Sequence, residues 1–346
     1  MGFIRYLLAA AVVMVHGPAN PLWLPPGNVA VESFFILSGF YMALILNEQY
    51  TKTIPFWLNR FLRLFPLYWL LFILAIPFRH GVIHTILALP LATKALLIAT
   101  NLGIVGQDLL FYLTPSLHFT AAPLASAPAR LHTLILIPPS WTLSLELCFY
   151  LLAPFLVRSP IRLAILAAAS LTLRLVLISQ GYTEDPFLYR LFPQELLFFC
   201  LGSLAWHLLR YLKAHHPEPL ARAALPTTAF ILAWLATFSL IPLPAAIHLP
   251  LWYAALTLAL PFIFHATGKL RASNWLGELS YPLYLSHLLV IWSLTRYAPH
   301  IPILNTHPAL LSLTILAIAT ALAFLLHTLV EIPIAPLRRK LRNIAR

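Results

Sequence analysis

Long apolar runs follow one another along almost the whole chain, and short polar or proline-rich stretches separate them. A helix needs about 20 apolar residues to cross the hydrocarbon core of a bilayer. The sequence therefore predicts an all-α bundle of transmembrane helices in a single domain, residues 1–346. The candidate runs are 3–17, 29–47, 61–78, 86–104, 142–157, 161–179, 190–212, 226–242, 248–267, 280–298 and 309–331.

The basic residues decide how many of these runs cross, because lysine and arginine collect on the cytoplasmic side of a membrane. With the N-terminus inside, Arg60 and Arg158 both fall inside only if one run between them does not cross. The run 86–104 carries Lys94 and Asn101, and we predict that it is an interfacial or re-entrant helix. About ten crossings remain, with both termini and most basic residues in the cytoplasm.

Composition supports a membrane protein and argues against other classes. Of the 346 residues, 61% are hydrophobic and 9% are charged, whereas soluble domains carry about 25% charged residues. Basic residues that orient the spans in the membrane account for the net charge of +12, so nucleic acid is not an expected partner. Cys148 and Cys200 lie inside apolar runs, which excludes a disulfide framework or a cysteine-rich zinc site. We expect the first run to stay uncleaved.

Three ionisable side chains lie within the predicted spans, where a charge is costly and usually marks a functional site. The topology places His16, Glu32 and Glu146 in the outer halves of the first, second and fifth crossings, at one depth. A carboxylate beside an imidazole fixes its tautomer and makes it a better base. We therefore predict that these three residues form a catalytic group. The alternative is a buried polar cluster that only holds helices together.

Three arginines are expected at the opposite, cytoplasmic surface. Arg5 precedes His16 by a helical distance of about 16 Å. Arg60 and Arg63 share one helical face because they are three residues apart. Guanidinium groups suit phosphate because they bond to it bidentately. All three are candidates for binding a phosphate-bearing cofactor, although position alone favours ordinary cytoplasmic anchoring.

Five short motifs contain these residues. The first is Arg5, ten residues, then His16. The others are ESFFILSGF at 32–40, RFLRLFPLYW at 60–69, WTLSLE with FY at 141–150, and LGELSYPLYLSH at 276–287. Together, and in this order, they resemble the acyltransferase-3 family of bacterial membrane acyltransferases. Within them the resemblance marks as supporting residues Ser38, Tyr68, Trp141, Ser144 and His287.

One position departs from the family pattern, because Thr142 follows Trp141 where serine is usual. Thr142 keeps the hydroxyl group, so the departure puts little in doubt. The histidine of the last motif, His287, is expected to be structural rather than catalytic.

The resemblance implies an enzyme of the bacterial cytoplasmic membrane that transfers an acyl group, usually acetyl, from acyl-coenzyme A. The acceptor would be a hydroxyl of a cell-surface glycan that approaches from the outer side. Arg60 and Arg63 would hold the donor's phosphates at the cytoplasmic face, while Arg5 positions the donor or the histidine. His16 would act as general base or briefly carry the acyl group. No metal is expected.

Two other functions stay open at this point. A glycan or small-molecule transporter would also carry intramembrane charges, but it gives no reason for the spacing of Arg5 and His16. A catalytically idle scaffold of a polymer-assembly complex would survive the loss of His16. Measuring surface O-acetylation after replacing His16 separates acyl transfer from both.

Overall fold

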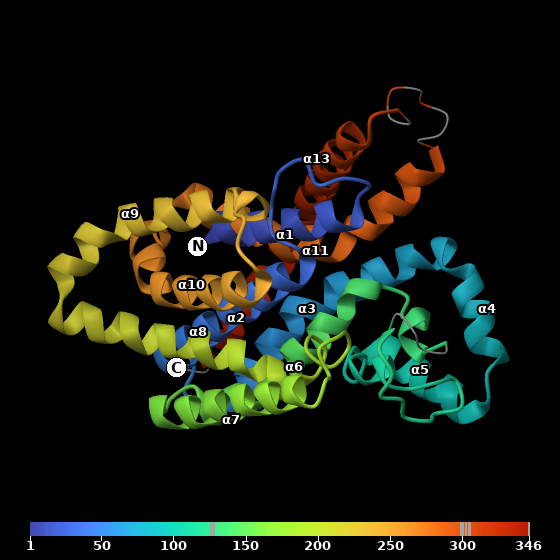
Figure 1. Ribbon diagram of the computed structural model, residues 1–346, viewed down its shortest axis with the longest axis horizontal. Coiled ribbons are helices and arrows are strands. Elements are labelled where there is room, and N and C mark those ends of the chain that lie inside the picture. The colour runs from blue at the N-terminus through green and yellow to red at the C-terminus, as the bar shows by residue number, and fades with distance from the viewer. Residues whose placement is uncertain (125–128, 298–300, 302, 304–305, 345–346) are drawn as a thin grey trace.

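A computed structural model describes residues 1–124, 129–297, 301, 303 and 306–344. Every regular element in these ranges is helical, as the sequence predicts (Figure 1). The α-helices are α1 (Gly2–His16), α2 (Gly27–Glu48), α3 (Thr53–Ala75), α4 (His80–Ala88), α5 (Leu91–Gly103), α6 (Trp141–Leu156), α7 (Pro160–Ser179), α8 (Phe192–His215), α9 (Pro217–Ala236), α10 (Ala245–Thr267), α11 (Arg271–Tyr297), α13 (Pro308–Leu326) and α14 (Ile332–Ile344). Shorter helical turns are η1 (Ile76–Phe78), η2 (Leu109–Phe111), η4 (Leu131–Leu134), η5 (Pro138–Ser140), η6 (Phe238–Leu240) and η8 (His327–Glu331).

The number of helices suited to crossing a membrane is smaller than predicted. In the described ranges, 7 helices are long and apolar enough: α2, α3 with η1, α7, α8, α9, α10 and the continuous segment Pro308–Ile344. The expected count of about ten is therefore not confirmed. α1 and α6 have only 15 and 16 residues, whereas about 20 are needed. α11 is long enough but carries Arg271, Glu278 and Arg296.

The run predicted at 86–104 is divided between two helices. Pro90 interrupts it, so that α4 ends before the proline and α5 begins after it. α5 has 13 residues, too few to span the hydrocarbon core. It lies with α4 at one edge of the bundle (Figure 1). The hydroxyl of Tyr68 donates to the backbone carbonyl of Asn101 at 2.5 Å, which attaches α5 to α3.

Close backbone contacts hold the centre of the bundle. α1 packs along α11 and α2, and α2 packs along α8. A side chain at Gly39 would collide with the carbonyl oxygen of Phe199, and one at Gly202 with that of Ile36. Helices in membranes associate through such small residues because these let the backbones approach. These contacts fix the positions of the helices that carry the first, second and last motifs.

A π-helical turn, η8, joins α13 to α14. Single π-turns inside α-helices occur frequently at functional sites. The turn brings α14 against α3, where the side-chain amide of Asn59 donates to the carbonyl of Arg338 at 2.8 Å. The C-terminal helix is thereby placed beside the start of the third helix.

Candidate active site

One cavity, of about 420 Å³, is surrounded by residues of α1, α2, α3, α6, α11 and α14. This volume lies within the range of small-molecule sites. Its mouth lies where α1 and α3 begin and α2 ends, and its inner end is lined by Val31, Phe34 and Tyr284. Each of the five motifs contributes lining residues, so motifs that are far apart in sequence meet here.

The three arginines proposed for phosphate binding all line this cavity. Arg5 lies over the ring of Tyr41, with 5.7 Å between guanidinium carbon and ring centroid. Arg60 lies 5.9 Å from the ring centroid of Tyr150 and donates to the side-chain carbonyl of Asn59. Arg63 is more tightly held, because two carboxylates contact it. Arg338 and Arg342 of α14 line the same cavity.

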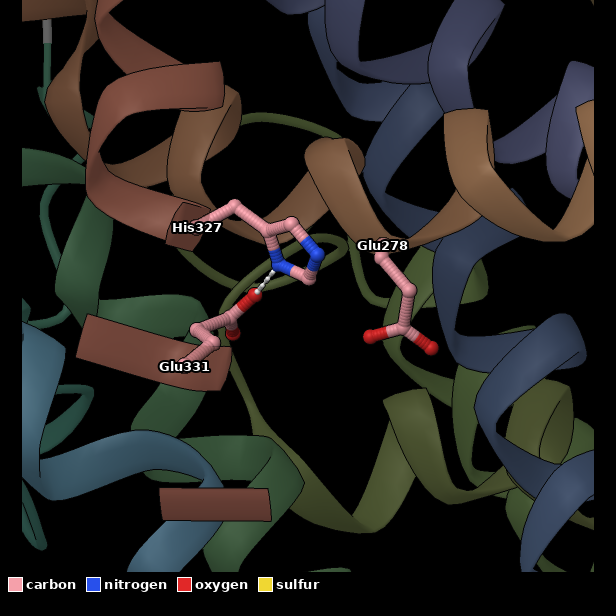
Figure 2. A group of neighbouring side chains, drawn as sticks. All are labelled: Glu278, His327 and Glu331. Atoms are coloured by element: carbon pink, nitrogen blue, oxygen red, sulfur yellow. Dashed lines mark hydrogen bonds and ion pairs between the residues drawn. The ribbon is translucent and has the colours of Figure 1, made fainter. Parts of the chain in front are cut away.

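Two carboxylates fix Arg63. Its Nη1 atom lies 2.7 Å from Glu278 and 3.1 Å from Glu331. Nδ1 of His327 donates to Glu331 at 2.7 Å, and Figure 2 shows this bond with Glu278 across from the imidazole. Glu278, His327 and Glu331 place potential metal-ligand atoms within 4.8 Å of one another. An ion there would lie against the Arg63 charge, so we assign the cluster to holding that arginine.

Glu146 lies in the cavity and has two hydroxyl partners. Ser38 donates to its Oε1 at 2.8 Å, and Tyr150 donates to the same oxygen at 2.5 Å. All three residues line the cavity together with Arg60. The predicted contact between this carboxylate and His16 is not formed, because Ser38 and Tyr150 hold it in the cavity.

His16 pairs with another histidine. Its Nδ1 lies 3.2 Å from Nε2 of His287 and 2.8 Å from the carbonyl of Val12. Nδ1 of His287 lies 2.6 Å from the carbonyl of Tyr284. A carbonyl only accepts, so Nδ1 of His287 carries the hydrogen and its Nε2 is an acceptor. Both neighbours of His16 Nδ1 then accept, which leaves Nε2 of His16 with a free lone pair.

The two histidines differ in exposure, and neither is among the described residues that line the cavity; His287 is joined to that lining through Tyr284. His287 is fully buried, whereas His16 is exposed. Tyr284 lines the cavity, and its hydroxyl lies 2.9 Å from that of Thr142. Its ring centroid is 6.0 Å from that of Phe34. Tyr284 therefore contacts the cavity on one side and His287 on the other.

Glu32 belongs to a different buried group. Arg174 donates to its Oε1 at 2.7 Å, and the hydroxyl of Tyr253 donates to its Oε2. Glu195 of α8 lies near this group. Its two carboxylate oxygens are buried and have no hydrogen-bond partner among the described residues. The predicted contact between Glu32 and His16 is thus replaced by an ion pair with α7. Hydropathy could not identify Arg174 as the partner, because it lies 142 residues away.

The remaining supporting residues make contacts outside the cavity. Arg190 lies 4.3 Å from the ring centroid of Trp141. Ser144 donates to Asp108 at 2.6 Å. Burial raises the pKa of Asp108, and the Ser144 hydrogen bond opposes this effect. The hydroxyl of Tyr68 is bonded to α5. The residues that line the cavity do not include Tyr68, Trp141 or Ser144.

Sequence reasoning missed two arginines of this site. Arg338 and Arg342 are not among the three arginines predicted to bind phosphate, whereas the structure places them at the cavity. Their spacing of four residues puts them on one helical face, which is the signal that was available. Glu278, which lies inside the last motif, was also not singled out.

A family model described as an acyltransferase domain matches residues 1–328, a range that contains all five motifs. The acyltransferase MdmB of Streptomyces mycarofaciens is 27% identical over 351 aligned residues, which cover 92% of this chain and 84% of that protein. No solved structure matches the chain.

Proposed function

Since this chain belongs to the acyltransferase-3 family and is a multi-pass membrane acyltransferase, we propose that it transfers an acetyl group from acetyl-coenzyme A to a sugar hydroxyl. The acceptor is a cell-surface glycan or a related sugar on the outer side of a bacterial cytoplasmic membrane. Both termini lie in the cytoplasm. The convergence of five motifs on one arginine-lined cavity is the observation that supports this most.

The donor's nucleotide end is proposed to bind at the mouth of the cavity. Arg5, Arg60 and Arg63 line it, and arginine binds phosphate bidentately. Positively charged residues gather on the cytoplasmic side of membranes, where coenzyme A is found. The acyl arm would then extend along Ser38 and Glu146 toward the inner end.

Beyond the inner end of the cavity, His16 is proposed as the general base. Its Nε2 takes the proton from the acceptor hydroxyl as the hydroxyl oxygen attacks the thioester carbonyl carbon. The carbon–sulfur bond breaks, and the thiolate leaves and takes the proton from His16. The products are the ester and free coenzyme A. In the alternative order, Nε2 itself attacks the thioester carbonyl carbon and the coenzyme A thiolate leaves. The sugar hydroxyl then attacks the acyl-imidazole, its proton passes to the thiolate, and the ester forms as Nε2 is released.

His287 is proposed as a positioning residue for this base. Its Nε2 accepts from Nδ1 of His16, so the reactive nitrogen of His16 is the one that carries no hydrogen. The bond from His287 to the Tyr284 carbonyl holds the second ring in its own tautomer. The Tyr284 carbonyl thus fixes the tautomer of His287, and His287 fixes the tautomer of His16.

Tyr284 lines the cavity and contacts His287, and the Phe34 ring packs against Tyr284. Moving Tyr284 would break its hydrogen bond to Thr142, whereas the Phe34 side chain makes no hydrogen bond that a movement would break. We propose that the Phe34 ring turns aside when the acyl arm extends toward His16.

The test uses the full chain in its native membrane with two variants, His16→Ala and His265→Ala. His265 is exposed on α10 and serves as the matched histidine control. After equal membrane amounts are confirmed, O-acetyl groups on surface glycans are quantified by mass spectrometry. We expect His16→Ala to reduce transfer by roughly 10²–10⁴-fold. Unchanged O-acetylation would exclude the proposal.

The donor is tested separately with purified protein in detergent. Release of free thiol from acetyl-coenzyme A is measured with and without isolated glycan. An acetyl group found on His16 after incubation without acceptor would support the covalent order, and its absence together with full transfer would support direct attack.

A further inference from the structure

We propose that α14 completes the donor site, with Arg338 and Arg342 binding the phosphates of the coenzyme A nucleotide. This inference rests on the proposed function and names further residues of the same site. It concerns a helix that lies beyond residues 1–328, the range that the family model matches.

The position of α14 is set by contacts on both sides of its start. Glu331, in the π-turn just before it, contacts Arg63 at 3.1 Å. Within α14, the carbonyl of Arg338 accepts from Asn59, and Asn59 in turn accepts from Arg60. The helix is thereby connected to both arginines of the third motif. Its placement at the cavity is a consequence of those bonds.

The basic residues of α14 divide between two faces. Arg338 and Arg342 are half-buried and line the cavity. Arg339 and Lys340 are exposed. Residues four apart lie on one face of a helix and immediate neighbours do not. Only the first pair therefore faces the space in which a donor would lie.

Arg338 and Arg342 also have unused hydrogen-bonding capacity. Their Nε atoms are buried and have no hydrogen-bond partner among the described residues, as is true of Nε of Arg60. Arg63, by contrast, is already engaged by two carboxylates. A buried donor group without a partner is unfavourable, and a bound phosphate oxygen would satisfy it.

The net positive charge of the residues around the cavity also favours an anionic ligand. Among the described lining residues there are five arginines and two glutamates. Like charges that converge on one space repel one another unless an anion lies between them. The phosphates of coenzyme A supply several negative charges. An anionic lipid headgroup presents the same phosphate chemistry, so the experiment has to distinguish the two sources.

The experiment measures coenzyme A affinity by calorimetry, with the full chain in nanodiscs of zwitterionic phosphatidylcholine. The variants are Arg338→Ala and Arg342→Ala, and Arg339→Ala is the matched control on the exposed face. Loss of a charge-assisted contact is expected to weaken coenzyme A binding roughly tenfold or more in the first two variants. The control is expected to bind like the unaltered chain.

Two further arms sharpen the result. Arg342→Lys keeps the positive charge but cannot bond bidentately to phosphate. Its affinity for coenzyme A is expected to lie between that of Arg342→Ala and that of the unaltered chain. An intermediate affinity would show that the loss in the alanine variant is not caused by poor folding. Nanodiscs with added phosphatidylglycerol test the lipid source. If anionic lipid displaces coenzyme A, and only lipid binding depends on Arg338 and Arg342, the site is a headgroup site and the inference is overturned.

The remaining outcomes separate this inference from the proposed function. If the unaltered chain binds coenzyme A and both alanine variants bind it equally well, α14 is not part of the donor site, while the donor assignment stands. If the unaltered chain does not bind coenzyme A at all, both the donor assignment and the inference are wrong.

Discussion

Nδ1 of His16 lies 3.2 Å from Nε2 of His287, although 271 residues separate the two. The pair connects the first motif to the last. The parallel packing of α1 along α11 creates it, because both helices start at the mouth of the cavity and run toward the same side of the bundle. The acid–base chemistry proposed for the enzyme depends on this contact.

Replacing His287 by alanine is expected to lower kcat, because His16 loses the acceptor that fixes its tautomer. The loss should be smaller than the roughly 10²–10⁴-fold expected for His16→Ala. The KM for acetyl-coenzyme A should change little, since His287 is not at the mouth. A pH–rate profile is the decisive measurement. If kcat falls but the profile keeps its shape and midpoint, His287 has a purely structural role.

Replacing Arg63 by alanine is expected to raise the KM for acetyl-coenzyme A more than the KM for the acceptor. It also leaves Glu331, which is 6% exposed, without its cation. The melting temperature should therefore fall as well, and a second change, Glu331→Gln, should partly restore it. Arg222→Ala, on an exposed ion pair, is the control. A change in acceptor KM alone would contradict the proposed orientation of the site.

Glu32 is expected to matter for stability rather than for chemistry. Glu32→Gln removes the anion paired with Arg174 and should cost about 3–5 kcal/mol, the usual range for breaking a buried ion pair. Thermal unfolding in detergent measures this loss. At a temperature where the variant is folded, kcat should stay close to that of the unaltered chain. If the folded variant has a much lower kcat, Glu32 takes part in catalysis.

Gly39→Ala and Gly202→Ala are each expected to destabilise the protein by about 1–3 kcal/mol, because the new methyl group meets a backbone carbonyl. Gly81→Ala is the matched control, since its methyl group would have no neighbour within 4 Å. The control should be neutral or slightly stabilising. Equal melting temperatures for all three variants would show that α2 and α8 are not held as closely as described.

The sequence predicted the helical class and part of the cavity lining, namely Arg5, Ser38, Arg60, Arg63 and Glu146, because motif spacing and hydropathy report on single helices. It did not predict which charges pair. Glu32 meets Arg174, and Arg63 meets Glu278, through helix packing between segments 142 and 215 residues apart. Equal depth in the membrane was not sufficient to place Glu32 beside His16, since depth says nothing about which face of a helix a side chain occupies.

The count of about ten crossings is not confirmed for a related reason. A hydropathy window responds to apolar character and cannot tell a helix surrounded by lipid from one surrounded by protein. α1 is short, but most of its residues are buried among other helices. The π-turn that places α14 likewise has no sequence signature, so hydropathy could not show that Arg338 and Arg342 reach the cavity.

The glycine contacts between α2 and α8 have a consequence for how relatives of this enzyme would diverge. Ser38 of the cavity adjoins Gly39, so backbone atoms set the position of that wall. On the α14 side, long side chains set the width instead. Differences in donor preference are therefore expected to arise from substitutions in α3 and α14, while the α2 wall stays the same.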